Sequence, residues 1–132
     1  MEENHKSVRH RGVERLLKAF SYSWDGIRSA FACEEAFRQE IWALLVALPA
    51  AVLLPHLSLH YRLELVAAAL LLLVVELLNS ALEAIVDKAS PEIHPLAKRA
   101  KDMGSAAVLL SVLINWIFWG GALWMAFGGG NA

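Results

Sequence analysis

Apolar positions dominate the chain from about residue 41 onward, and they fall into three long runs. The longest, residues 106–127, contains no ionisable side chain. About 20 apolar residues are needed to cross the ~30 Å hydrocarbon core of a bilayer, and shorter runs are typical of buried helices in soluble proteins. This run therefore predicts a membrane-spanning helix over about residues 100–127.

The two preceding runs predict two further spans. Residues 65–75 are all apolar and lead into a segment with acidic residues, which predicts a span over about residues 63–87. Residues 41–54 are apolar, but Pro55, His56 and Ser58 follow them. A span over about residues 35–59 therefore needs interfacial residues or a tilt to reach across. Pro49 does not divide this run, because neighbouring groups can satisfy the carbonyl that a proline leaves free in a membrane helix.

Ahead of these spans, apolar residues recur at steps of three and four, and basic residues occupy other positions. This pattern predicts an amphipathic helix over about residues 8–31. Such a stripe can be the core face of a soluble module, but directly before a membrane span it favours a helix in the headgroup plane. The apolar positions are Val13, Leu16, Leu17, Phe20, Trp24, Ile27 and Phe31, and the basic ones are Arg15, Lys18 and Arg28.

Composition and charge agree with a membrane protein. Hydrophobic residues make up 58% of the chain, well above the usual share for a soluble domain, and the net charge is −1. Basic residues cluster before the first span and between the last two, whereas Arg62 alone lies between the first two. The positive-inside rule then predicts a cytoplasmic N-terminus and a C-terminus on the opposite side. Because Cys33 is the single cysteine, no intrachain disulfide can form. We expect one all-α membrane domain over residues 1–132.

The second predicted span carries polar residues on one face. Glu76, Asn79, Glu83 and Asp87 are three and four positions apart, and the three acids fall within a sector of about 40°. A charged side chain at the centre of a bilayer costs about 2.5–3.5 kcal/mol on insertion scales. These residues therefore need a site or a helix interface that receives them. The alternative that they only join helices by hydrogen bonds stays open.

Two of the acids suit a metal ion. Glu34 and Glu83 are expected at a similar depth near the cytoplasmic boundary, whereas Glu76 lies about 10 Å deeper than Glu83. Mg²⁺ in phosphoryl-transfer sites is typically held by one or two carboxylates together with phosphate oxygens and water. Glu34 and Glu83 could share such an ion.

Before the third span, one helical face carries charged and hydroxyl groups. Lys98, Lys101, Asp102 and Ser105 recur at steps of three and four. Two ammonium groups beside the membrane suit a phosphate ligand, although for Lys98 a simple positive-inside anchor is the favoured interpretation. No Walker loop, dinucleotide-binding turn or nucleophile elbow accompanies them.

Four segments carry a resemblance to a known family. KAFSYSWDGIR (18–28), EEAFRQE (34–40), VELLNSALEAIVD (75–87) and AKRAKDMGSAA (97–107) resemble the prokaryotic diacylglycerol kinases. The resemblance implies a homotrimeric bundle of three-span subunits in the bacterial cytoplasmic (inner) membrane, with active sites shared between subunits. It also implies transfer of a phosphoryl group from ATP, with Mg²⁺, to the primary hydroxyl of diacylglycerol at the cytoplasmic membrane interface, giving phosphatidate.

The resemblance further implies roles for individual residues. Glu76 is the catalytic base, Glu34 and Glu83 bind the metal, and Asn79 and Asp87 support the site. The implied nucleotide contacts are Arg15, Tyr22, Glu34, Glu83, Glu92, Ile93, His94, Lys101 and Asp102. The implied lipid contacts are Arg15, Ala19, Phe20, Ser21, Tyr22, Ser23, Trp24, Ser29, Ala30, Phe31, Ala32, Glu35, Ala36, Phe37, Arg38, Gln39, Glu76 and Ser105. One departure is Asp25, which stands where the family has a basic residue.

Three alternatives remain open. An undecaprenol kinase of the same family would share ELLN (76–79) and HPLAK (94–98), although AFRQE (36–40) favours diacylglycerol. A small transporter or channel subunit would use the acidic face to line an ion path. A membrane scaffold would use the same face only to fix the register of its helices.

Overall fold

The computed structural model describes residues 12–90 and 94–128, and nearly all of them are helical. The helices are α1 (Gly12–Cys33), α2 (Glu35–Leu53), α3 (Leu59–Ala89), α4 (Pro95–Leu123) and a short π-helical continuation (Trp124–Gly128). The described residues contain no strand. Helix α2, helix α3, and helix α4 with its continuation are each long and apolar enough to cross a membrane. The prediction of an all-α chain with three apolar helices is confirmed.

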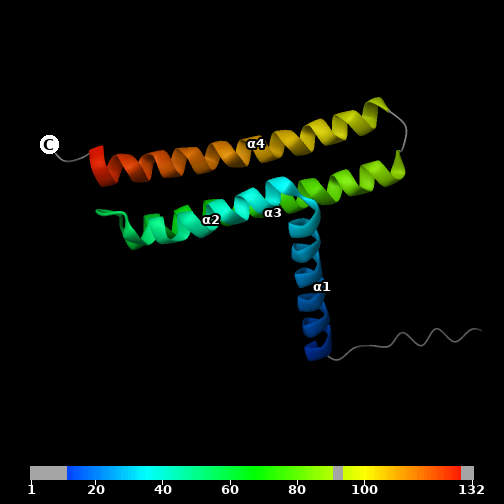
Figure 1. Ribbon diagram of the computed structural model, residues 1–132, viewed down its shortest axis with the longest axis horizontal. Helices are drawn as coiled ribbons and strands as arrows, with labels where there is room; N and C mark the ends of the chain where they lie inside the picture. Colours follow the sequence, from blue (N-terminus) through cyan, green and yellow to red (C-terminus); the bar gives the residue numbers. More distant parts are fainter. Residues whose placement is uncertain (1–11, 91–93, 129–132) are drawn as a thin grey trace, which may run out of the picture.

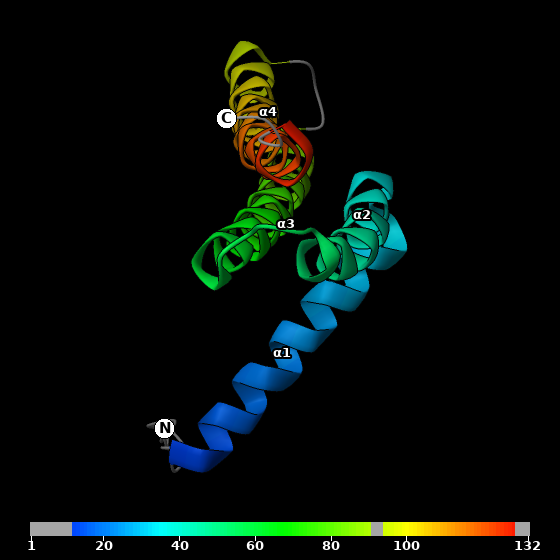
Figure 2. The same cartoon turned by 90° about the vertical axis from the view of Figure 1, so that its left-hand side faces the viewer.

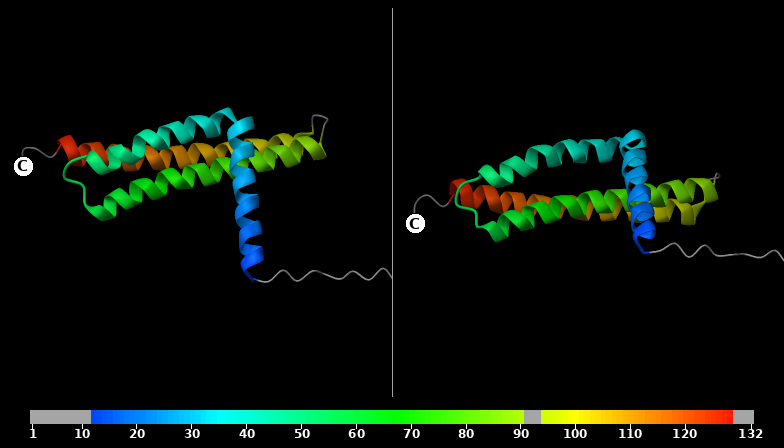
Figure 3. Two further views of the ribbon diagram at one scale, coloured as in Figure 1. Left: turned by 60° about the horizontal axis from the view of Figure 1, so that its bottom comes forward. Right: turned by 90° about the horizontal axis from the view of Figure 1, so that it is seen from below.

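Three helices lie lengthwise beside one another, and the fourth crosses them. Helices α2, α3 and α4 form an elongated bundle, while α1 extends away from it crosswise (Figures 1 and 2). The most extensive packing joins α3 to α4, and α2 packs on α3. Helix α1 crosses α3 and meets the bundle only near its own C-terminal end (Figure 3). Residues 8–11 of the predicted amphipathic helix lie outside the described residues.

Local chemistry sets the helix ends. Helix α2 stops at Leu53, before the predicted end at 59, because Leu54 precedes Pro55 and takes an extended backbone (φ −59°, ψ 127°). Helix α3 starts at Leu59, earlier than residue 63, since the Ser58 side chain accepts a hydrogen bond from the Tyr61 N–H (3.2 Å) and caps the helix.

Helix α4 starts at Pro95, five residues before the predicted position. His94 is its N-cap, and its Nδ1 accepts a hydrogen bond from the Leu96 N–H (3.2 Å). Proline suits the first helical position because its missing N–H would be unpaired there in any case. Lys98, Lys101 and Asp102 therefore stand on a helix that is already formed.

Side-chain hydrogen bonds hold α3 against α4 far from the charged residues. The Asn115 side chain is buried and donates to the carbonyls of Ala68 (2.9 Å), on α3, and Ser111 (3.0 Å), on α4. The Tyr61 hydroxyl donates to the Phe118 carbonyl (2.9 Å). A Cβ at Gly121 would lie 2.5 Å from that hydroxyl oxygen, so a larger residue there would displace Tyr61 from this hydrogen bond.

Arg62 closes the opposite end of the bundle from the charged residues of α4. Its guanidinium donates to carbonyl groups at the C-terminal end of α2, which have no partners in their own helix, and to one in the connection that follows. The distances are 2.8 Å to the Leu54 oxygen and 3.2 Å to the Leu57 oxygen, and the Ala51 and Val52 carbonyls also accept. One side chain at the start of α3 thus ties down the end of α2.

Replacing Arg62 with an apolar residue of similar length should leave these carbonyls unsatisfied. We expect Arg62→Met to lower the free energy of unfolding by about 2–4 kcal/mol, because hydrogen bonds to a charged group are among the stronger ones. Unfolding of the purified protein in detergent, followed by circular dichroism, measures this. Arg99→Met is the control, since Arg99 is exposed and lies near the other end of the bundle. Equal stability of the two variants would contradict the conclusion that Arg62 stabilises the end of α2.

Candidate functional site

The polar face of α3 points into the molecule at its centre and emerges toward the C-terminal end of the helix. Glu76 is 4% exposed, whereas Asp87 is exposed. A helix of 31 residues is about 46 Å long and exceeds the ~30 Å hydrocarbon core. Its acidic end can therefore extend beyond the bilayer while Glu76 stays inside.

Asn79 links the acids of this face to α4. Its Nδ2 donates to Glu83 Oε1 (3.3 Å), one turn further along α3. Its Oδ1 is buried without a partner among the described residues and lies against Gly104 of α4. A Cβ at position 104 would be 2.2 Å from this oxygen. The missing side chain of Gly104 is what allows Asn79 to fit between the helices.

Glu34 reaches the same region from the junction of α1 and α2. It is the N-cap residue of α2, with an extended backbone (φ −105°, ψ 119°). Arg38 fixes the junction, because its Nη1 donates to the last carbonyls of α1, those of Phe31 (3.1 Å) and Ala32 (3.2 Å). The charges of Glu34 and Glu83 both act on Glu76. Carboxylates from two parts of the chain therefore share one electrostatic environment.

This arrangement suits a cation that binds together with a phosphate ligand. Within the part of the chain that the structure describes, no three His, Cys, Asp or Glu side chains form a complete metal cage. Mg²⁺ needs no such cage when nucleotide oxygens and water supply its other ligands. Mutual repulsion among Glu34, Glu76 and Glu83 is what a bound cation would relieve. The donor set therefore fits Mg²⁺ held jointly with a phosphate.

Lysine–carboxylate pairs lie beside the acids. Lys101 Nζ lies 2.8 Å from Asp87 Oδ1 and so joins α4 to α3. Lys98 Nζ lies 2.6 Å from Asp102 Oδ2, one turn along α4. Sequence spacing suggests the second pair but contains no sign of the first, which depends on how the two helices align. These groups are partly exposed and so open to a soluble ligand.

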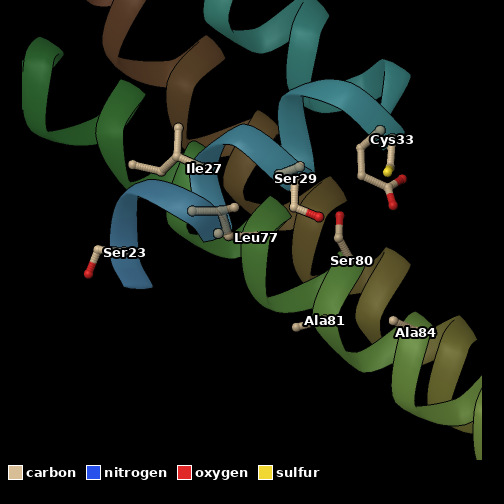
Figure 4. Close-up of a pocket in the computed structure, with 11 residues that line it drawn as sticks. Ser23, Ile27, Ser29, Cys33, Leu77, Ser80, Ala81 and Ala84 are labelled. Atoms are coloured by element: carbon tan, nitrogen blue, oxygen red, sulfur yellow. The ribbon is translucent and has the colours of Figure 1, made fainter. Parts of the chain in front are cut away.

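A cavity of about 570 Å³ separates α1 from α3 (Figure 4). Glu34 lines it together with three of the implied lipid contacts, Ser23, Ser29 and Ala30. The remaining lining residues appear in none of the implied sets, because they face the cavity only once α1 crosses α3. They are Gly26, Ile27, Cys33, Leu77, Ser80, Ala81 and Ala84.

Several implied contacts lie away from this cavity. Phe20 and Tyr22 are about 70% exposed (73% and 69%) on the part of α1 that extends from the bundle. Phe37 is 2% exposed and packs with Ala30 and Leu73, so it supports the junction of the helices. The other implied contacts on α1 that do not line the cavity are Arg15, Ala19, Ser21, Trp24, Phe31 and Ala32.

The remaining implied contacts are spread over the other helices. Gln39 donates to Glu35 (3.3 Å), and Ala36 is exposed beside them on α2. Ser105 is exposed on α4, and His94 caps that helix. Glu92 and Ile93 lie outside the described residues.

These features define a class: an all-helical chain with three membrane-length apolar helices and a cluster of carboxylates where a crosswise helix meets them. The family described as prokaryotic diacylglycerol kinase matches residues 21–123. The chain belongs to this family of enzymes. A diacylglycerol kinase of Escherichia coli (strain K12) is 46% identical over 117 residues, which cover 89% of this chain and 95% of that relative. The diacylglycerol kinase of Pseudomonas aeruginosa is 47% identical, over 82% of this chain and 87% of the relative. That of Helicobacter pylori (strain 26695) is 43% identical, over 83% and 85%.

Gly104→Ala should force α3 and α4 apart at the site, because the new methyl group would meet Asn79 Oδ1. We expect the free energy of unfolding in detergent to fall by about 1–3 kcal/mol, as for other overpacked cores. Gly120→Ala is the matched control on the same helix, since a Cβ there meets nothing within 4 Å.

A double variant separates this contact from other effects. Asn79→Ala removes the oxygen that the new methyl group would meet, so Gly104→Ala should destabilise an Asn79→Ala background much less than the unaltered protein. An equal loss of stability in both backgrounds would contradict the proposed contact.

Proposed function

We propose that this chain transfers the γ-phosphoryl group of ATP to the primary hydroxyl of diacylglycerol and releases phosphatidate, with Mg²⁺ as cofactor. Relatives over most of its length are named diacylglycerol kinase. The single observation that carries the proposal is the position of Glu76, a buried carboxylate within the electrostatic reach of Glu34 and Glu83. Membrane-embedded carboxylates in such a setting are rarely without a function.

Each residue of the cluster has a separate task in this reaction. Glu76 accepts the proton of the lipid hydroxyl as the hydroxyl oxygen attacks phosphorus. Glu34 and Glu83 would hold Mg²⁺, which neutralises charge on the phosphate oxygens when it is bound. Asn79 keeps Glu83 oriented through its hydrogen bond. Lys101 stabilises negative charge on the transferred group.

The place of the reaction is the cytoplasmic surface of the bacterial inner membrane. A helix that crosses three membrane-length helices has the orientation of one that lies in the headgroup plane. The apolar side chains of α1 support this, since Val13, Leu16 and Leu17 are each at least two-thirds exposed (74%, 73% and 67%). The clustering of basic residues supports a cytoplasmic N-terminus and a C-terminus on the opposite side.

The proposed assembly is a homotrimer with active sites shared between subunits. The N-terminal end of α1, which carries Arg15, extends away from the carboxylates of its own chain (Figure 1). This supports a nucleotide site to which Arg15 contributes beside another subunit. This agrees with the shared sites that the resemblance implies.

Glu76→Gln should abolish turnover, because the amide keeps the size of the side chain but cannot accept the proton. We expect a loss of at least about a hundredfold in the rate of phosphate transfer, as for removal of other general bases. The measurement follows labelled γ-phosphate from Mg·ATP into diacylglycerol in mixed micelles. Glu64→Gln is the control on the same helix, since Glu64 pairs with His60 toward its other end (2.9 Å).

The same assay, together with a measurement of ion flux, decides between the rival functions. Phosphorylation of undecaprenol in preference to diacylglycerol would move the protein to the other branch of its family. Absence of labelling with either lipid would overturn the kinase assignment. Ion flux through liposomes without consumption of ATP would favour a channel instead.

Loss of a metal-binding carboxylate should change the Mg²⁺ dependence. We expect Glu83→Gln and Glu34→Gln each to raise the Mg²⁺ concentration for half-maximal rate by about tenfold or more, because one of only two protein ligands is lost. Titration of Mg²⁺ at saturating ATP measures this, with Glu64→Gln again as control. A reduced rate with an unchanged Mg²⁺ requirement would show that Glu34 and Glu83 support the packing of the helices and do not bind the metal.

A further inference from the structure

The cavity between α1 and α3 has a hydroxyl group on each wall. Ser29 belongs to α1 and Ser80 to α3, and both side chains point into the space between the helices (Figure 4). Neither hydroxyl has a hydrogen-bond partner among the described residues. Serines in helices often donate back to a carbonyl of their own helix, as Ser23 does to Ala19 (2.9 Å) and Ser111 to Val108 (2.8 Å). Ser29 and Ser80 instead keep their donors available to a ligand.

Ser80 lies close to Glu76, the proposed catalytic base, along α3. Ser80 follows Glu76 by four residues, which places it on the same side of α3 about 6 Å along the axis. Glu34 lines the same cavity. Small side chains on both walls, including Ala30 and Ala81, leave the volume of about 570 Å³ open for the glycerol part of a lipid.

From this arrangement we infer that Ser29 and Ser80 donate hydrogen bonds to an ester carbonyl oxygen of the acceptor lipid and select diacylglycerol over lipid alcohols without esters. The inference rests on the proposed function and adds Ser80, which belongs to none of the implied contact sets. Diacylglycerol has only one hydroxyl, and in the proposed reaction that group gives its proton to Glu76. The other polar groups of the lipid are ester oxygens, which accept hydrogen bonds. Free hydroxyl donors complement these oxygens. Ether-linked lipids offer these donors only ether oxygens, which are weaker acceptors than a carbonyl, and isoprenoid alcohols offer no oxygen besides the hydroxyl, so both classes pair the two donors less well.

A comparison of two lipids with the same chains tests this. The full-length protein in mixed micelles is given a diacylglycerol or the corresponding dialkylglycerol, in which ether linkages replace both esters. With diacylglycerol, Ser80→Ala should raise KM by about five- to tenfold, as expected for one neutral hydrogen bond, with kcat within about twofold. Ser29→Ala should act in the same direction. With dialkylglycerol, the unaltered protein should already show the higher KM, and neither substitution should raise it further.

A control variant and two further results show whether the hydroxyl groups act on the ester. Ser111→Ala removes a hydroxyl that donates within its own helix, so it should leave both KM values unchanged. An equal loss with both lipids would assign Ser80 to packing and overturn the inference, as would equal KM values of the unaltered protein for the two lipids. If the unaltered protein phosphorylated neither lipid, the proposed function would fail and this inference with it.

Discussion

The contact between Asn79 and Gly104 sets the distance between α3 and α4 at the site. A Cβ at position 104 would lie 2.2 Å from the amide oxygen, so any larger residue would have to displace Asn79 or the helix. The other end of the same amide donates to Glu83. In hydrocarbon little water reaches polar groups between helices, so their partners come from the protein. The Asn79 amide nitrogen has such a partner in Glu83, whereas its oxygen has none among the described residues. One side chain therefore couples the separation of two helices to the orientation of a carboxylate, and the carboxylate site depends on how these helices pack.

The two ends of the bundle are held by interactions of different strength. At one end, Arg62 donates to several carbonyls at the end of α2 and in the connection after it. At the other end, Lys101 and Asp87 join α4 to α3, but their side chains are 38% and 65% exposed. Exposed ion pairs contribute little to stability. The end that carries the charged site is therefore the more easily opened, which suits the proposed entry of a nucleotide and a lipid there.

The sequence alone predicts the three apolar helices and the acidic face of α3, because both depend on local periodicity. It does not predict the role of Arg62, which looks like a lone positive charge in a short connection. Nor does it predict that Lys101 pairs with Asp87 or that Ser80 lines a cavity with Ser29. Each of these depends on the alignment of separate helices or on the direction in which α1 leaves the bundle. Local pattern carries no information about either.

The proposed reaction brings a soluble nucleotide and a membrane lipid to one carboxylate, which must then be reachable from two phases. Glu76 meets this requirement through its neighbours: Glu34 and Glu83 extend the negative charge toward the exposed end of α3, and the cavity beside Glu34 lies under α1. The crossing of α1 over α3 forms the wall of this cavity, yet only Ala30 of α1 is buried within one chain. So little support from its own bundle is what we expect of a helix that rests on a membrane surface or, in the proposed trimer, on a neighbouring subunit. In that proposal the geometry of the lipid site is completed by what lies outside a single chain.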